Sequence, residues 1–295
     1  MTENRADIFQ QQRPRLYGIA YRMLGSKHDC EDMLQEAYLR WHQVDGERIA
    51  SPMAWLTTAV TRLCIDRLRA SRTHREAYVG PWLPEPLVEQ QFIAPDRSTE
   101  IADDLSVAFL VVLERLAPEE RAAFLMHDVF DCEYTEIAHT LGKTEANCRQ
   151  IVHRARERVR RDRPRFHVTE VAHMRILERF IAAAHSGDPD ELRDLLAADA
   201  TWTSDGGGKT KAALKVVHGA ERVARFALGV WARYLHRLTR HVVSINGKPG
   251  LLMCLDNDPV LVISIDTDGT RILGVYTVLN PEKLRGIAIP SREVR

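Results

Sequence analysis

Five polar residues between positions 147 and 154 carry side chains that can read the edges of nucleic-acid bases. They are Asn147, Arg149, Gln150, His153 and Arg154. Amide groups pair with adenine, and guanidinium groups pair with guanine or with phosphate oxygens, so this set suits a DNA major groove. Their spacing places them on the outer faces of a single helix. The pattern therefore predicts DNA binding, with an ordinary solvated helix face as the alternative.

The element that must position these residues is a pair of helices over 131–165. The first helix has an apolar stripe at i, i+3, i+4 and i+7, and Gly142 supplies the chain reversal. Thr144 is placed to cap the second helix. Its apolar face consists of Cys148, Ile151, Val152, Ala155 and Val159. This pattern is typical of a helix-turn-helix whose second helix enters a major groove, and a plain helical hairpin is the alternative. Seven arginines between 154 and 165 favour DNA, because a phosphate backbone attracts such a charge density.

Two helices nearer the N-terminus expose further groups of defined chemistry. On the helix that Ser26 is expected to cap, an acidic ridge of Asp32, Gln35 and Glu36 faces away from the apolar side; taken alone, it indicates solvated surface. The next helix opens at Ser51-Pro52 and offers a tryptophan, hydroxyls and arginines: Trp55, Thr58, Thr61, Arg62, Arg69 and Arg72. Such groups suit a melted nucleic-acid strand. A tryptophan at helical spacing is nevertheless more often a core residue.

Charge is unevenly distributed along the 295 residues, although the formal net charge is zero. Residues 76–104 carry seven acidic side chains against one basic, and residues 145–165 carry eight basic against three acidic. The five cysteines are scattered, which favours reduced thiols over disulfides or a zinc site. No apolar run approaches the roughly 18 residues that span a bilayer. We therefore expect a soluble, cytoplasmic protein with no membrane partner, no metal and no cofactor.

Three stretches resemble, in order, the region-two and region-four motifs of bacterial extracytoplasmic function sigma factors. They are DCEDMLQEAYLRW at 29–41, AWLTTAVTRLCIDRLR at 54–69 and the helix-turn-helix at 133–156. Arg62 departs from the family pattern, which usually has Asn there. The resemblance implies that Asp32, Gln35 and Glu36 dock on the clamp helices of core RNA polymerase. It also implies that the helix over 55–72 recognises and melts the −10 element, and that the second helix of the helix-turn-helix reads the −35 element.

The acidic segment 76–104 contains four prolines between 81 and 95, which interrupt helix and predict a linker. Its apolar residues favour docking on another part of the chain over a free tether. The motif WLPEP comprises Trp82, Leu83, Pro84, Glu85 and Pro86. It resembles the linker motif of the sigma-factor subgroup that carries a C-terminal SnoaL-like extension, and we expect it to be regulatory.

After residue 166, helices followed by strand-like runs predict an α+β domain with an antiparallel sheet. The order of elements resembles the SnoaL-like cone fold, whose curved sheet wraps a cavity. Candidate lining residues are Trp202, His218, Trp231, Tyr234 and Tyr276. The DGGGK motif is Asp205, Gly206, Gly207, Gly208 and Lys209. It fits an anion-binding nest or a flexible turn; because it resembles a motif of the same subgroup, we expect a regulatory role.

These observations predict a multidomain chain. Two all-α sigma domains, 1–75 (region two) and 105–165 (region four), are joined by the linker 76–104 and followed by the α+β domain 166–295. We predict a sigma factor without catalytic residues that directs core RNA polymerase to promoter DNA. Its C-terminal domain regulates it in cis by contacting the helical domains or the linker. The alternatives are a DNA-binding module fused to a cyclase- or isomerase-like domain, with Asp205 or His218 as acid or base, and a repressor whose cavity binds a small molecule.

Overall fold

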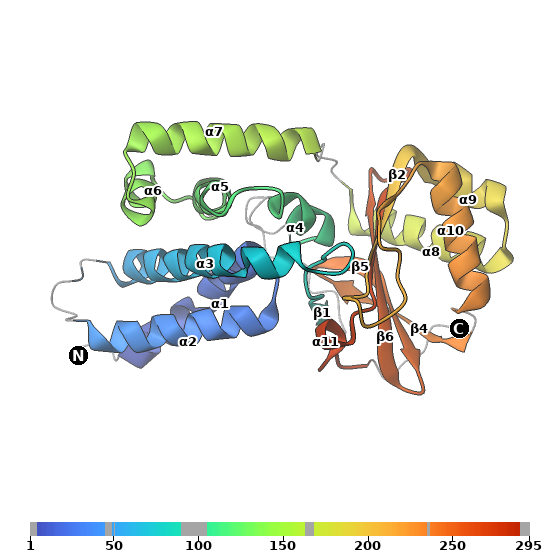
Figure 1. The fold of residues 1–295 in the computed structure, drawn as a ribbon, viewed down its shortest axis with the longest axis horizontal. Helices are drawn as coiled ribbons and strands as arrows, with labels where there is room; N and C mark the ends of the chain where they lie inside the picture. Colours follow the sequence, from blue (N-terminus) through green and yellow to red (C-terminus); the bar gives the residue numbers. More distant parts are fainter. Residues whose placement is uncertain are drawn as a thin grey trace. The chain divides into compact units, whose positions relative to one another are not determined.

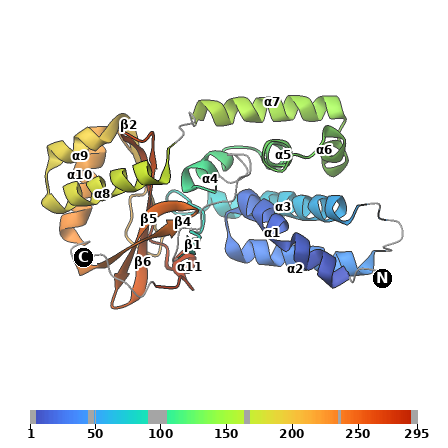
Figure 2. The same cartoon turned by 180° about the vertical axis from the view of Figure 1, so that it is seen from behind.

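The computed structural model describes residues 5–44, 49, 51–89, 105–162, 168–234 and 237–289, and for 72–76 and 89 the backbone alone. Contacts divide the chain into two units (Figures 1 and 2). The first comprises 1–76, 97–104 and 110–164; the second comprises 77–96, 105–109 and 165–295. Among the described residues, no helix combines the length and the apolar character needed to cross a membrane.

Three helices form the N-terminal part of the first unit: α1 (Arg5–Leu24), α2 (Lys27–Gln43) and α3 (Pro52–Glu76). The predicted start of α2 is confirmed, because the Ser26 side chain accepts a hydrogen bond from the backbone N–H of Asp29 at 3.3 Å. Its predicted apolar face is also buried, at Cys30, Leu34, Ala37 and Trp41. α1 packs against both other helices, which fixes the outward faces of α2 and α3.

The remaining helices of this unit follow α4 (Val107–Leu113). They are α5 (Pro118–Phe124), the π-helical turn η2 (Leu125–Val129), α6 (Tyr134–Leu141) and α7 (Glu145–Asp162). One apolar cluster joins them, formed by Ala123, Met126, Cys132, Ile137, Cys148, Ile151 and Val152. In both views α6 lies between α3 and the beginning of α7 (Figures 1 and 2).

Within the described residues, the second unit contains a seven-stranded sheet in the order β1-β4-β5-β6-β7-β2-β3. Its strands are β1 (Val88–Glu89), β2 (Leu196–Asp205), β3 (Val217–His218), β4 (Thr239–Ile245), β5 (Lys248–Leu255), β6 (Asp258–Thr267) and β7 (Ile272–Val278). The predicted meander of β4 to β7 is confirmed. The expectation of a wholly antiparallel sheet is wrong, because β2 pairs with β7 in parallel. Parallel neighbours need a long crossover, and the helix and meander between β2 and β7 supply it.

Helices α8 (Glu170–Ser186), α9 (Pro189–Leu195) and α10 (Ala220–Arg233) cover one face of this sheet (Figure 1). The indole of Trp202 lies 6.3 Å from the ring of Phe180 and 5.4 Å from that of Phe226. Of the candidate cavity residues, Trp202 and Trp231 thus belong to the packed core between helices and sheet. His218 and Tyr234 are exposed and Tyr276 is half-buried.

We call the predicted linker 76–104 the connector. Its described residues 77–89 belong to the second unit. The end of this described part forms β1, which pairs antiparallel with β4 through Val88 opposite Ile245. Leu87 adds two hydrogen bonds with Asn246: its N–H donates to Oδ1 at 3.1 Å, and its carbonyl accepts from the Asn246 N–H at 2.8 Å. The end of this half of the predicted linker is therefore an edge strand of the C-terminal sheet, whereas residues 90–104 lie outside the described part.

Candidate nucleic-acid interface and connector-binding site

The five polar residues predicted to read bases all lie exposed on α7: Asn147, Arg149, Gln150, His153 and Arg154. The opposite side of the helix is buried at the five positions that the apolar stripe predicted. A helix with one packed stripe and one exposed amide and guanidinium face has the form that enters a major groove. The structure thus brings this predicted set together on one surface.

The turn before α7 fixes the direction of that surface. Gly142 ends α6 in the left-handed region at φ 64°, a conformation that glycine adopts without strain. The Thr144 hydroxyl accepts a hydrogen bond from the N–H of Asn147 at 3.3 Å, which caps α7. The Arg149 guanidinium lies 4.9 Å from the centre of the Tyr134 ring, so α6 also holds one of the side chains predicted to read bases.

The acidic ridge of α2 lies at the surface of the first unit. Asp32 and Gln35 are exposed, and Glu36 is partly exposed. Within the described residues its contacts are local: Asp32 lies 3.7 Å from a ring nitrogen of His28, and Glu36 forms an ion pair with Arg40 at 2.8 Å. Exposed contacts of this kind contribute little stability, so breaking them would cost the first unit little.

Several α3 groups predicted to bind a melted strand contact other helices of the first unit. The hydroxyls of Thr58 and Thr140 share a hydrogen bond of 3.0 Å. Arg62 donates to the carbonyls of His139 at 2.6 Å and Thr140 at 2.9 Å. These carbonyls belong to the last turn of α6, where backbone acceptors lack helical partners and the helix dipole is negative.

The other α3 residues of the predicted set are placed differently. Thr61 is fully buried, and its hydroxyl has no hydrogen-bond partner among the described residues. Trp55 is half-buried with its ring 5.5 Å from that of Trp41, so it contributes to packing within the N-terminal helices. The side chain of Arg72 lies outside the described residues.

Arg69 forms an ion pair with Glu119, which also pairs with Lys143 at 3.0 Å. One carboxylate at the start of α5 therefore engages a cation of α3 and a cation of the helix-turn-helix turn. The hydrogen bond from Lys143, together with the charges of Lys143 and Arg69, holds the pKa of Glu119 below its usual value, although burial acts in the opposite direction. A cavity of about 330 Å³ beside this cluster is lined also by Asn147 and Arg154.

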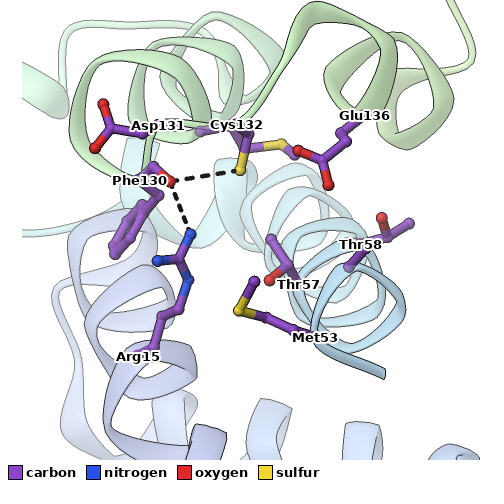
Figure 3. A pocket seen from close by; sticks show the side chains of 10 residues that line it. Arg15, Met53, Thr57, Thr58, Phe130, Asp131, Cys132 and Glu136 are labelled. Carbon is purple, nitrogen blue, oxygen red and sulfur yellow. Dashed lines mark hydrogen bonds between the residues drawn. The ribbon is translucent and has the colours of Figure 1, made fainter. Parts of the chain in front are cut away.

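A second cavity, of about 230 Å³, lies where α1 and α3 meet η2 and α6 (Figure 3). Arg15 of α1 reaches across to donate to the Phe130 carbonyl at 2.7 Å. Met53, Thr57 and Thr58 line the α3 side, and Cys132 and Glu136 line the opposite side. Burial raises the pKa of the Cys132 thiol to about 11, and the charge of Glu136 adds to the shift. The packing between these helices is thus incomplete.

The DGGGK and WLPEP motifs meet inside the second unit, at Asp205. This residue has no exposed surface. Its carboxylate accepts hydrogen bonds from the Tyr78 hydroxyl at 2.6 Å, the Leu83 N–H at 2.8 Å and the Lys283 ammonium at 2.7 Å. Its backbone carbonyl accepts from the N–H groups of Leu279 and Asn280. Asp205 therefore joins the end of β2 to the connector and to the segment after β7.

Asp205, Tyr78, Leu83 and Lys283 together form what we call the connector-binding site. Lys283 lies in the short helix α11 (Pro281–Leu284). Its ammonium also donates to the Leu83 carbonyl and lies 4.2 Å from the centre of the Trp82 ring. Burial, with the hydrogen bond to Asp205, raises the pKa of Tyr78. Asn280 donates to the Tyr78 oxygen at 2.9 Å. Sequence reasoning missed Tyr78, Asn280 and Lys283, because no local pattern marks residues that meet only in the fold.

The glycines of DGGGK allow the close approach of the connector. A Cβ at Gly207, where φ is 58°, would lie 2.3 Å from Nδ2 of Asn280; one at Gly208 would lie 3.1 Å from Val79. Lys209 is exposed and pairs with Glu282, and that hydrogen bond lowers the pKa of Glu282. The remaining members of WLPEP lie alongside, with Pro84 and Pro86 buried and Glu85 half-buried.

The catalytic alternative relied on Asp205 or His218 inside a cavity. The Asp205 carboxylate accepts three hydrogen bonds, two from side chains and one from a backbone N–H, and is sealed from solvent, whereas His218 is exposed on the edge strand β3. Asp205 is therefore committed to contacts inside the fold, and His218 lies at the surface and not inside a cavity.

Known proteins match both the helical parts and the whole chain. The family Sigma-70 region 2 matches residues 8–74, and Sigma-70, region 4 matches residues 106–159. The ECF RNA polymerase sigma factor SigJ of Mycobacterium tuberculosis is 36% identical over 298 residues, which cover 97% of this chain and 95% of that protein. The probable ECF RNA polymerase sigma factor SigI of the same species is 30% identical over 274 residues, covering 92% of each.

The crystal structure of M. tuberculosis extracytoplasmic function sigma factor SigJ has the same architecture. It superposes with a TM-score of 0.76 at 36% identity, over 93% of this chain and 96% of that one. The match thus includes the two sets of helices and the C-terminal α+β domain. Since the likeness in sequence and in fold runs through all of these parts, the chain belongs to the extracytoplasmic function RNA polymerase sigma factors.

Proposed function

We propose that this sigma factor binds core RNA polymerase through the acidic ridge of α2 and reads promoter DNA with α3 and α7. The observation that carries the proposal is the exposed face of α7, where five amide, imidazole and guanidinium side chains stand opposite a fully packed stripe. In this assignment α7 reads the −35 duplex. Thr58, Arg62, Arg69 and Arg72 of α3, with Trp55, act at the −10 element, whereas Thr61 is buried and offers no surface to a DNA strand. The protein acts in the cytoplasm, and no catalytic role is assigned to its C-terminal domain.

Transcription with purified core polymerase tests this proposal. Promoters are first found by sequencing the transcripts that the wild-type protein directs. Asn147→Ala and Arg154→Ala should then lower promoter-dependent transcription by the equivalent of about 1–3 kcal/mol per lost base contact, while core polymerase is still retained. Glu157→Gln, an exposed α7 change outside the predicted set, is the matched control. Retention of core polymerase by a variant with Asp32, Gln35 and Glu36 all changed to alanine would refute the role of the ridge.

We propose further that the C-terminal domain regulates the sigma factor in cis through the connector. The buried contact of Asp205 with Leu83, Tyr78 and Lys283 supports this, because it ties the connector to the C-terminal sheet. Asp205→Asn and Trp82→Ala should each change promoter-dependent transcription while the affinity for core polymerase is kept. If both variants transcribe as the wild type does, regulation through this contact is ruled out.

A further inference from the structure

Within the described part of the chain, arginine side chains donate several hydrogen bonds between the N-terminal helices and the later helices of the first unit. Arg62 donates to the last carbonyls of α6, Arg69 pairs with Glu119, and Arg15 donates to the Phe130 carbonyl. From the other side, Arg121 donates to the Met23 carbonyl. Cations held by oxygen acceptors thus link the two sets of helices.

The acceptors that face α3 have the chemistry of a nucleic-acid backbone. Glu119 is an anion whose lowered pKa keeps it charged, and it binds Arg69 and Lys143 together. The end of α6 offers two carbonyl oxygens at the negative pole of a helix. Guanidinium groups bind phosphate oxygens by the same short, charge-assisted hydrogen bonds. Arg62 and Arg69 therefore already hold the kind of ligand that a DNA strand would offer.

The contact is also suited to reversal. Arg69 keeps 55% of its side-chain surface exposed and Glu119 keeps 33%, so water and salt reach this ion pair. Cavities of about 230 and 330 Å³ flank the contact, and Thr58 of α3 and Glu136 of α6 both line the first (Figure 3).

We propose that the contact of α3 with α6 and Glu119 is a latch in which protein oxygens occupy the places of DNA phosphates on Arg62 and Arg69. The closed arrangement and a single DNA strand then compete for the same cations. Arg62, the residue that departs from the family pattern, is the member that reaches α6. The proposal rests on the proposed role of α3 in binding DNA.

A reversible lock tests the latch directly. The hydroxyl oxygens of Thr58 and Thr140 are 3.0 Å apart, so Thr58→Cys with Thr140→Cys can form a disulfide across the contact. The oxidised double variant should lose binding to a fluorescein-labelled single-stranded DNA of mixed sequence, and reduction should restore it. The Thr58→Cys variant alone controls for a bridge to Cys132, which lines the same cavity. Equal DNA affinity of the oxidised and reduced double variant would overturn the proposal.

Removing the competing anion is the complementary test. Glu119→Gln should tighten binding of the same DNA at low salt by roughly two- to fivefold, the size of one exposed ion pair. Asp66→Asn is the matched control, since Asp66 pairs with Arg69 at 3.6 Å from within α3 and does not bridge to another helix through that pair. If both variants tighten binding equally, the effect is one of net charge and the latch is refuted.

Failure of the underlying function has a different signature. Arg69→Ala in an otherwise unchanged chain should weaken DNA binding. If it does not, α3 is not a DNA-binding surface, and the competition fails with it. If Arg69→Ala weakens binding while the disulfide has no effect, α3 binds DNA and the latch alone is wrong.

Discussion

Two contacts hold together segments that are far apart in the sequence, and they differ in burial and in chemistry. At the connector-binding site, Asp205 and Lys283 retain 0% and 9% of their side-chain surfaces, and each has several partners. At the α3–α6 contact, Arg62 and Arg69 are exposed and cavities lie alongside. A buried charge cannot lose its partner without a large penalty, whereas exposed groups exchange protein oxygens for water. We therefore expect the connector-binding site to stay closed and the α3–α6 contact to open more readily.

The largest expected effect separates the two contacts by stability. Asp205→Leu should cost the second unit about 3–5 kcal/mol of unfolding free energy, because the Lys283 ammonium stays buried without its carboxylate. Urea denaturation followed by tryptophan fluorescence measures the loss. The double variant Asp205→Leu with Lys283→Met should recover part of it. An equally large loss in the single and double variants would show that Asp205 contributes through packing and not through charge.

Acid should also distinguish the units. Burial, with the nearby charge of Lys248, lowers the pKa of His173 in α8 from 6.5 to about 4, although a hydrogen bond to the Pro249 carbonyl opposes the shift. The unfolded chain binds this proton first, so the second unit should lose up to about 3 kcal/mol as pH falls from 6.5 to 4. Glu119, with its lowered pKa, stays ionised through most of that window. Unfolding free energies measured against pH should show a flatter slope for His173→Gln; an unchanged slope would contradict the assignment.

Backbone geometry gives a test of intermediate size at the connector-binding site. Gly207→Ala should cost about 2–3 kcal/mol, because φ is 58° and the new Cβ would strike Asn280. Gly286→Ala is the control: φ there is 74°, with no atom within 4 Å of an added Cβ, and it should cost about 1 kcal/mol. Thermal unfolding compares the two variants. Equal costs would mean that the Asn280 side chain moves aside easily.

The smallest effect is expected at the α3–α6 contact. Arg62→Ala should lower the stability of the first unit by about 1 kcal/mol or less, because water can replace the lost hydrogen bonds. The loss should shrink further as salt is added. Arg13→Ala, which breaks an exposed pair between α1 and α2, is the matched control. A loss as large as that of Asp205→Leu would erase the contrast between the two contacts.

Features that depend on near neighbours in the sequence were predictable. The buried stripe of α7, the cap at Ser26 and the turn at Gly142 follow from helical period and local hydrogen bonding. The five polar positions of α7 are exposed because the same period places them opposite that stripe. Their DNA contacts stay a prediction, as do those of α3 and α2.

Features that depend on distant partners were not predictable from periodicity. The parallel pairing of β2 with β7 requires knowing which strands become neighbours. Asp205 stood out because three glycines follow it, yet its partners Tyr78 and Lys283 lie 127 and 78 residues away. The sequence pattern placed Thr61 among the outward residues of α3. This prediction was wrong, because α3 packs on more than one side and Thr61 is buried.

The strand β1 has a further consequence for the fate of the C-terminal sheet. By pairing with β4, a short piece of connector satisfies backbone groups near Ile245 that would otherwise face solvent. A bare strand edge is a template for any extended chain, including another copy of the same protein. Release of the connector would therefore free that segment and also expose an unpaired edge of β4 to which a second copy of the protein could bind. We therefore expect self-association of the protein to increase when the contact between Asp205 and the connector is broken.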